Sequence, residues 1–524
     1  MSRRLACNIA IYAGHMVVVC LLWPALVSAQ LTTAQAAGKH VYREGSSPSN
    51  RPIEAVLGEG STRVPGRLMP CASCHGSDGK GRPEGGVVPS AVTWDILAAP
   101  LRKNDVLGRQ RPAYDLISLR RAITQGVDPS GHRLGPSMPS YRLSPTDLDT
   151  LIQYLRVLGK DADPGLTGNT IRLGAIVPVD GPLAVTGQSS VALLQAYFDE
   201  LNQQGGVYGR TIELRAMETP GMSRTQRGAQ EFVQANDIFA AISVLPPGAE
   251  NELTGVTEQL GIPTIGGFAS RSHGDGSSES KTFYLLSGLP QQARVLVKFA
   301  REHLEDPLAR IAVIYPESAQ DLADAVIDQC RTASLDNVQS VKFSGSAAGP
   351  VAESLSHQGV RSVFFLGRGN ELQEMLEGAA KLDWIPTVFQ PGPLAGPEVF
   401  AIPPAFDQHI FLAFPMLPSD MDAEALHEYK LLAQKHHLAS AQPAIALTAL
   451  AAAKVLVEAL RESGRQLSRD KLITILSGIY GFNTGLTPPV SYSTTRRIGA
   501  LGAYVVRLDL KNKSFTPVDS WMVP

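Results

Sequence analysis

The sequence lacks an excess of charge of either sign. Lysine and arginine number 47, aspartate and glutamate number 49, and charged residues make up only 18% of the chain. A nucleic-acid-binding surface needs a concentrated basic field, and a disordered chain combines high net charge with low hydrophobicity. Because hydrophobic residues reach 44%, the composition excludes a nucleic-acid partner and indicates a folded protein. The length of 524 residues predicts more than one domain.

Cysteine is scarce, and long apolar runs are confined to the N-terminus. Two of the five cysteines, Cys7 and Cys20, lie in residues 1–29. We interpret that segment as a signal peptide, since arginines at its start precede an apolar run and small residues up to Ala29. An uncleaved membrane anchor is the alternative. No later run is long enough to span a membrane, and three cysteines are too few for a disulfide scaffold. The sequence therefore predicts a protein exported to the periplasm.

Two of the remaining cysteines fall in one motif, Cys71-Ala72-Ser73-Cys74-His75. Thiols at this spacing can each form a thioether with a haem vinyl group, and the adjacent imidazole can then ligate the iron. A zinc half-site would need two further ligands, and a thioredoxin-like redox pair would not require the histidine. The motif therefore predicts one haem c, covalently attached through Cys71 and Cys74, with His75 as an axial ligand.

A six-coordinate electron-transfer haem needs a second axial ligand on the face opposite His75. Met138, in a proline-flanked loop, is the candidate. Met69 is too close to Cys71 in sequence to reach the far face. His132 is the alternative ligand, and the ordinary role for a lone loop methionine is core packing. We expect Met138 to ligate the iron.

Helical patterns flank this methionine loop. One predicted helix ends near Gly126, and another begins with a cap at Ser144 and closes at Gly159. The order of haem motif, glycine-rich loop, methionine loop and closing helix resembles the monohaem cytochrome c family over residues 38–162. The resemblance implies an all-α domain.

The same resemblance implies that Pro89 offers its carbonyl to the free nitrogen of His75. The chain departs from the family pattern just ahead of the cysteines. Residues 42–70 are rich in Gly, Ser, Pro and Arg, where the family usually has a helix. The segment that packs against the closing helix is therefore not evident from the sequence.

Residues 163–168 are polar and turn-prone, which predicts a linker. Beyond it, strand-like apolar segments alternate with helical stretches. The predicted strands cover residues 171–177, 211–215, 238–244, 311–315, 362–366 and 410–414, and the first predicted helix covers about 188–203. This alternation predicts an α/β architecture with parallel sheets.

Five segments resemble, in order, parts of the type I periplasmic binding proteins, especially the branched-chain amino acid receptors. They are Ile171 to Pro178, Gly205 to Arg210, Gly261 to Ile265, Arg310 to Tyr315, and Gly481 to Gly485. The resemblance covers residues 169–524 and implies two lobes that close over a small ligand near the strand ends. The expected fold is thus multidomain, an all-α cytochrome c domain followed by a two-lobed α/β domain of the periplasmic-binding-protein type I class.

The loops at the strand ends are the expected ligand cleft. The residues predicted to line it are Thr186, Pro246, Pro247, Gly267, Phe268, Tyr315, Arg368 and Gln390. Amino acid receptors usually present small hydroxyl residues where this chain has Pro246, Pro247 and Phe268. Proline has no backbone donor and phenylalanine no polar group, so we expect a ligand other than a zwitterionic amino acid. Ordinary tight turns and, for Arg368, a solvated surface position are the alternatives.

These features predict a periplasmic c-type cytochrome that transfers electrons with a periplasmic redox partner, a dehydrogenase or oxidase, and binds a small organic ligand. The alternative is a solute-binding receptor of an ABC-type transporter, or of a sensor, with a regulatory haem. An enzyme is not expected, because no Ser-His-Asp arrangement, metal cluster or paired-carboxylate motif stands out in the second domain.

Overall fold

The computed structural model describes residues 31–524 apart from 59–61, 77, 82–88, 102–109, 162, 178–183, 218–225, 244–250, 269–279, 304–308, 345–347 and 439–442. The chain forms two compact units, Met1–Asp161 and Ala162–Pro524. The expected signal peptide lies outside the described residues. Among the helices that are described, none combines the length and the apolar character needed to cross a membrane.

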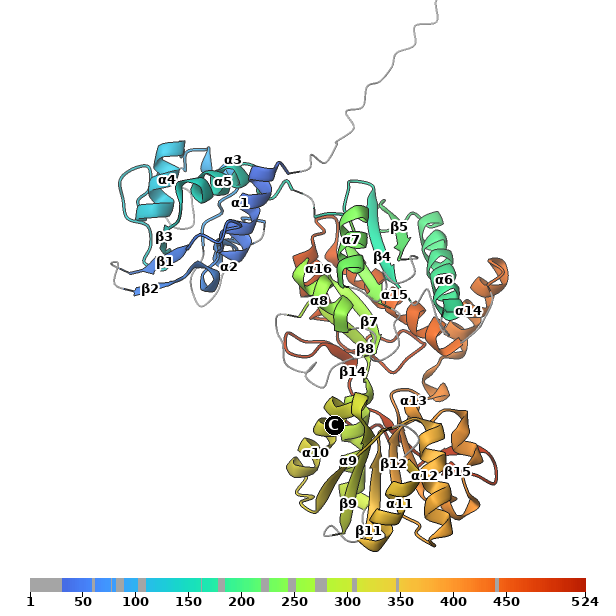
Figure 1. Ribbon diagram of the computed structural model, residues 1–524. Coiled ribbons are helices and arrows are strands. Elements are labelled where there is room, and N and C mark those ends of the chain that lie inside the picture. The colour runs from blue at the N-terminus through green and yellow to red at the C-terminus, as the bar shows by residue number, and fades with distance from the viewer. Residues whose placement is uncertain are drawn as a thin grey trace, which may run out of the picture. The chain divides into compact units, whose positions relative to one another are not determined.

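The first unit is mainly helical (Figure 1). Its helices are α1 (Thr33–Glu44), α2 (Cys71–His75), α3 (Trp94–Leu97), α4 (Leu116–Gln125) and α5 (Pro145–Leu155). The two predicted helices are confirmed as α4, which Gly126 ends in the left-handed conformation, and α5, which the Ser144 side chain caps. The predicted end of the second helix at Gly159 is wrong, because α5 ends at Leu155. A short sheet of order β2-β1-β3 adds to the expected all-α architecture. Its strands are β1 (Glu54–Leu57), β2 (Thr62–Pro65) and β3 (Ser140–Arg142).

Helix α1 packs against the closing helix α5, a role that the sequence left unassigned (Figure 1). It begins at Thr33, upstream of the expected domain start, and strands β1 and β2 separate it from the cysteine motif. Gly38 lies where the helices cross, and a Cβ added there would be only 1.9 Å from the backbone oxygen of Thr150. Tyr42 and Tyr154 pack together beside this crossing with ring centroids 5.7 Å apart. The close approach therefore depends on glycine.

Residues 163–168, expected to be a linker, pack within the second unit. Leu166 is buried in a hydrophobic core of that unit. The carboxylate of Asp163 accepts a hydrogen bond of 2.7 Å from the backbone N–H of Arg469. The second unit thus begins ahead of residue 169.

The second unit contains two sheets, each covered by helices on both faces (Figure 1). The first lobe has the order β14-β8-β7-β6-β4-β5, and all of its strand pairs are parallel, as expected. Its strands are β4 (Thr170–Ile176), β5 (Thr211–Ala216), β6 (Ala240–Ser243), β7 (Thr264–Phe268), β8 (Thr282–Leu286) and β14 (Ile498–Ala500). One face packs against α6 (Ala184–Gln203), α15 (Pro443–Ser463) and α16 (Arg469–Leu476), with α14 (Ala423–Lys435) beside α6, and the other against α7 (Gln226–Asn236) and α8 (Asn251–Gln259).

The second lobe has the order β10-β9-β11-β12-β13-β15-β16. Its strands are β9 (Arg310–Pro316), β10 (Val338–Phe343), β11 (Val360–Phe365), β12 (Thr387–Pro391), β13 (Ile410–Phe414), β15 (Tyr504–Asp509) and β16 (Ser514–Pro517). Helices α9 (Leu289–His303) and α10 (Gln320–Thr332) cover one face, and α11 (Ala348–His357), α12 (Gly369–Lys381) and α13 (Gly392–Ala395) the other. The expectation of purely parallel sheets is wrong here, because β15 starts beside the end of β13 and pairs with it antiparallel, as β16 does with β15.

In the described part of the chain, the backbone passes between the lobes three times. The crossings lie near residues 287–288, 415–422 and 501–503. The Ser287 hydroxyl donates to the Ala500 carbonyl at 3.3 Å and accepts from the Gly502 N–H at 2.8 Å. The Tyr504 hydroxyl donates to the Asp420 carboxylate at 2.6 Å. Hydrogen bonds therefore tie the third crossing to both of the others.

Candidate functional site

The cysteine motif of the first unit forms the short helix α2, which starts directly after Pro70. Cys71 is half-buried, Cys74 is exposed, and neither is in a disulfide. Burial raises the pKa of the free Cys71 thiol to about 11, so it is protonated at neutral pH. Both sulfurs are thus available on one helical turn for attachment to a haem.

The imidazole of His75 is buried and held through one nitrogen. Nδ1 lies 2.8 Å from the backbone carbonyl of Ser90, which can only accept, so Nδ1 carries the proton and Nε2 keeps its lone pair. Burial lowers the pKa of His75, and the hydrogen bond to Ser90 opposes this only in part. The ring is therefore neutral at pH 7, which is the form that ligates iron.

The expectation that Pro89 supplies this carbonyl is wrong, because the next residue, Ser90, does so. The Pro89 carbonyl packs instead against Gly81, where an added Cβ would lie 2.3 Å from its oxygen. Gly81 has a φ of 87°, a conformation that favours glycine. The Pro89 carbonyl therefore faces Gly81, whereas the Ser90 carbonyl faces the imidazole.

The structure places the two candidates for the second axial ligand in different surroundings. Met138 is half-buried and packs against the hydrophobic core that also receives Cys71. Its N–H donates to the Gly135 carbonyl at 2.9 Å, which holds the loop in a turn. The side chain of His132 is 75% exposed, and its Nδ1 lies 3.6 Å from the Asp128 carboxylate. The surroundings favour Met138 over His132.

Two buried tyrosines, which the sequence did not single out, hold the backbone on either side of α2. The Tyr42 hydroxyl donates to the Gly76 carbonyl and the Tyr141 hydroxyl to the Met69 carbonyl, both at 2.7 Å. Burial raises the pKa of both phenols, so they remain donors at neutral pH. No local motif marks these positions, because each bond spans many residues of sequence.

The donor set fits a covalently attached haem c. Cys71 and Cys74 offer two free thiols on one helix. The hydrogen bond of His75 uses Nδ1 and leaves Nε2 for the iron, and Met138 offers a thioether in the adjoining core. When bound, the haem supplies one-electron oxidation and reduction. The protein's own contribution is to fix the tautomer and orientation of His75 through Ser90 and to shield the imidazole from water.

The residues predicted to line a ligand cleft are described only in part. Pro246 and Pro247 lie outside the described residues, and only the backbone of Phe268 is described, at the end of β7. Gly267 lies in the same strand, where an added Cβ would be 3.0 Å from the Thr448 side chain. Gly267 thus permits close packing between β7 and α15.

Two predicted cleft residues lie at the carboxyl ends of strands in the second lobe. Tyr315, in β9, is buried, and its hydroxyl is 2.9 Å from the Ser340 hydroxyl. Gln390, in β12, is also fully buried; its Nε2 donates to the Gly367 carbonyl at 2.9 Å, while no bond to its Oε1 occurs among the described residues. The Oε1 atom of Gln390 is therefore a buried hydrogen-bond acceptor at the end of β12.

The remaining two cleft candidates differ in exposure. Thr186 is buried near the start of α6, where its backbone carbonyl accepts from the Ser190 hydroxyl at 2.8 Å. Arg368 is exposed at the start of α12, and its backbone N–H donates to the Glu371 carboxylate at 2.7 Å. The exposure of Arg368 agrees with its alternative interpretation as a solvated surface arginine.

Comparison with known families matches both units. A family model described as periplasmic binding protein matches residues 170–514, and one described as cytochrome c matches residues 68–159. The curated relative Leu/Ile/Val-binding protein homolog 7 of Brucella abortus is 24% identical over 225 residues, which cover 38% of this chain and 55% of the relative. The chain thus spans about half the length of this relative.

Solved structures share the fold of the second unit. A fatty acid ABC transporter substrate-binding protein from Thermomonospora curvata is 17% identical with a TM-score of 0.52, and the match covers 69% of this chain and 95% of that one. A branched chain amino acid ABC transporter from Thermus thermophilus with bound valine is 18% identical with a TM-score of 0.53, covering 69% of this chain and 97% of that one. Identities this low indicate a shared architecture and leave the ligand open.

Proposed function

Because the chain belongs to the periplasmic binding protein family and carries a cytochrome c domain with covalent haem c ahead of that region, we propose that it is a periplasmic electron-transfer protein that also recognises a small organic molecule. A periplasmic dehydrogenase or oxidase is the class of redox partner. The haem unit exchanges electrons with that partner, and the two-lobed unit binds the ligand.

The surroundings of His75 and Met138 support the proposal that this unit transfers electrons. The hydrogen bond to Ser90 leaves Nε2 of His75 for the iron, and Met138 packs in the same core as Cys71. With His75 and Met138 both ligating, no iron position remains open for substrate, which favours electron transfer over catalysis. Met ligation also raises the reduction potential.

For the second unit we propose a ligand less polar than a zwitterionic amino acid. Pro246 and Pro247 supply no backbone donors and Phe268 no polar group to pair with the charged ends of such an amino acid. The fold is compatible with both kinds of ligand, since one similar structure is a fatty acid ABC transporter substrate-binding protein and another holds valine. Leaving a charged ligand group unpaired costs about 1–3 kcal/mol, a loss of affinity of about five- to more than a hundredfold.

The second candidate function is a transporter receptor or sensor in which the haem is regulatory. The names of the similar structures favour it, because both refer to ABC transporters. The two functions differ in what the haem does. Electron transfer requires rapid oxidation of the reduced haem by a partner with or without ligand, whereas a regulatory haem changes ligand affinity with its redox state.

Haem attachment is tested by denaturing the full-length protein and staining it for haem peroxidase activity. Wild type and Cys330→Ala, which removes the buried cysteine of α10, should retain the stain. The double variant Cys71→Ala with Cys74→Ala should lose it. Release of haem from denatured wild type would contradict covalent attachment.

Ligand class is tested by calorimetry on the haem-bearing full chain. Small aromatic or alcohol compounds should bind more tightly than leucine or glutamate. Tight, selective binding of a branched-chain amino acid would show that our interpretation of Pro246, Pro247 and Phe268 is wrong. Repeating the titration with reduced and oxidised haem separates the two candidate functions.

A further inference from the structure

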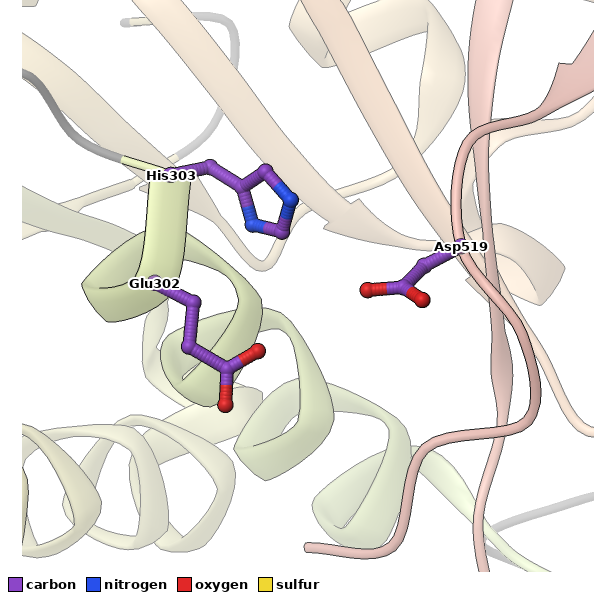
Figure 2. Close-up of side chains that lie close together, drawn as sticks. All are labelled: Glu302, His303 and Asp519. Carbon is purple, nitrogen blue, oxygen red and sulfur yellow. The ribbon is translucent and has the colours of Figure 1, made fainter.

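The end of α9 and the chain segment after β16 bring together, in the second lobe, three side chains of types that can ligate a metal (Figure 2). Glu302 and His303 close α9, and Asp519 follows β16. A ligand atom of each lies within 4.8 Å of those of the other two. The three groups thus come from two segments that lie far apart in the sequence, and their ligand atoms lie close together.

The ring of His303 is fixed in a form suited to a metal. Its Nδ1 lies 2.9 Å from the Phe299 carbonyl, so Nδ1 carries the proton and Nε2 keeps a lone pair. The ring also stacks on Phe299 with centroids 4.0 Å apart and planes 22° from parallel. A carbonyl behind the imidazole is a usual partner of metal-ligating histidines, because it sets the tautomer and orientation.

The charges around these side chains favour a cation. No ion pair between described residues includes Glu302 or Asp519, although two nearby carboxylates repel each other unless a positive charge lies between them. The backbone carbonyls at the end of α9 add partial negative charge. Lys298 lies one turn before Glu302 in α9, but its ammonium donates to the Val523 carbonyl at 2.9 Å and forms no ion pair with Glu302. Asp519 Oδ1 accepts from the Ser520 N–H at 2.7 Å, which leaves its other oxygen available.

We propose that Glu302, His303 and Asp519 form a binding site for a divalent transition-metal ion such as Zn²⁺. One imidazole nitrogen with two carboxylate oxygens suits zinc, with water completing the coordination, whereas Ca²⁺ and Mg²⁺ prefer oxygen ligands alone. The ion joins the end of α9 to the C-terminal segment. None of the haem residues and none of the residues predicted to line the ligand cleft takes part in this site.

The test uses the full-length haem-bearing protein after treatment with EDTA, which removes loosely bound ions and leaves the covalently held haem. Zn²⁺ is titrated by calorimetry, and hydrogen exchange of residues 514–524 is followed with and without Zn²⁺. The variants are His303→Ala and Asp519→Asn. The matched control is His357→Ala, which removes another exposed histidine from the last turn of a helix in the same lobe.

Wild type and His357→Ala should bind Zn²⁺ equally and show slower exchange in residues 514–524. Both site variants should bind at least about tenfold more weakly, since even an outer-shell partner is worth about 10- to 100-fold in affinity. Asp519→Asn keeps the side-chain shape, so it serves as the test even if His303→Ala disturbs α9. Unchanged Zn²⁺ affinity in Asp519→Asn, no binding by wild type, or equal binding of Mg²⁺ would each overturn the proposal.

Discussion

Replacing Gly38 by alanine should destabilise the haem unit selectively. An added Cβ would lie 1.9 Å from the Thr150 oxygen and 2.8 Å from Cβ of Tyr154, whereas real Cβ contacts are essentially never under 3.0 Å. The nearest of these atoms belongs to the backbone of α5 and cannot rotate away. Helices α1 and α5 must therefore separate by about 1 Å and loosen the packing of Tyr42 against Tyr154.

The size of the effect follows from two opposing contributions. Overpacking a core costs about 1–3 kcal/mol, and the rigid backbone obstacle at Thr150 puts Gly38→Ala at the upper end. Alanine also stabilises the helix by about 1 kcal/mol relative to glycine, because its helix propensity is higher. The net loss is about 2 kcal/mol, which corresponds to a fall in Tm of roughly 6–10 °C for a unit of this size.

The assay is thermal unfolding followed in the Soret band, which reports the haem unit alone. The control is Gly255→Ala in α8, where an added Cβ meets nothing within 4 Å. Far-UV circular dichroism should show no loss of stability in the control. A Gly38→Ala variant with the Soret transition of wild type would refute the claim that α1 and α5 need glycine at their crossing.

Three further predictions concern other parts of the chain. Met138→Ala should abolish the weak methionine-to-iron charge-transfer band and lower the reduction potential, and an unchanged spectrum would contradict Met138 ligation. The hydrogen bond from Lys435 holds the pKa of Glu200 below its ordinary 4.5, so this carboxylate stabilises the fold above that pH and the contribution is lost as pH falls through the lowered pKa. Urea unfolding should therefore show Glu200→Gln less stable than wild type at neutral pH and equally stable in acid, and a difference that persists in acid would contradict this. Tyr504→Phe removes a bond to the Asp420 carboxylate and should cost about 1.5–3 kcal/mol in urea unfolding, whereas a cost near zero would show that the bond does not hold the lobe crossings.

Sequence reasoning succeeded where the determining information is local. The spacing of the cysteines and His75 identified the haem motif because covalent attachment dictates that spacing. The caps at Ser144 and Gly126 located α5 and α4, since a cap acts within a few residues. Likewise, the apolar strand at 410–414 was predicted with its observed bounds.

It failed where distant segments decide the outcome. Gly38 matters only because Thr150 meets it across two helices. The caps at Thr32 and Gly45 mark α1 locally, but no local pattern shows that it packs against α5. Residue types likewise do not show which of two neighbouring carbonyls, that of Pro89 or that of Ser90, bonds His75. The convergence of His303 with Asp519 arises from the final strands returning to α9, which no local pattern records.

The way Asp163 and Leu166 are built into the second unit decides how the gene can be divided. A fragment beginning at residue 169 would discard the buried Leu166, worth about 1.5–3 kcal/mol, together with the acceptor for the Arg469 N–H. A fragment that begins ahead of Asp163 retains both the buried Leu166 and the Asp163 acceptor. Neither lobe can be excised as one continuous stretch, since each is assembled from pieces that the other interrupts. The second unit should therefore be produced whole, and truncations designed from the apparent polarity of residues 163–168 would yield weakened protein.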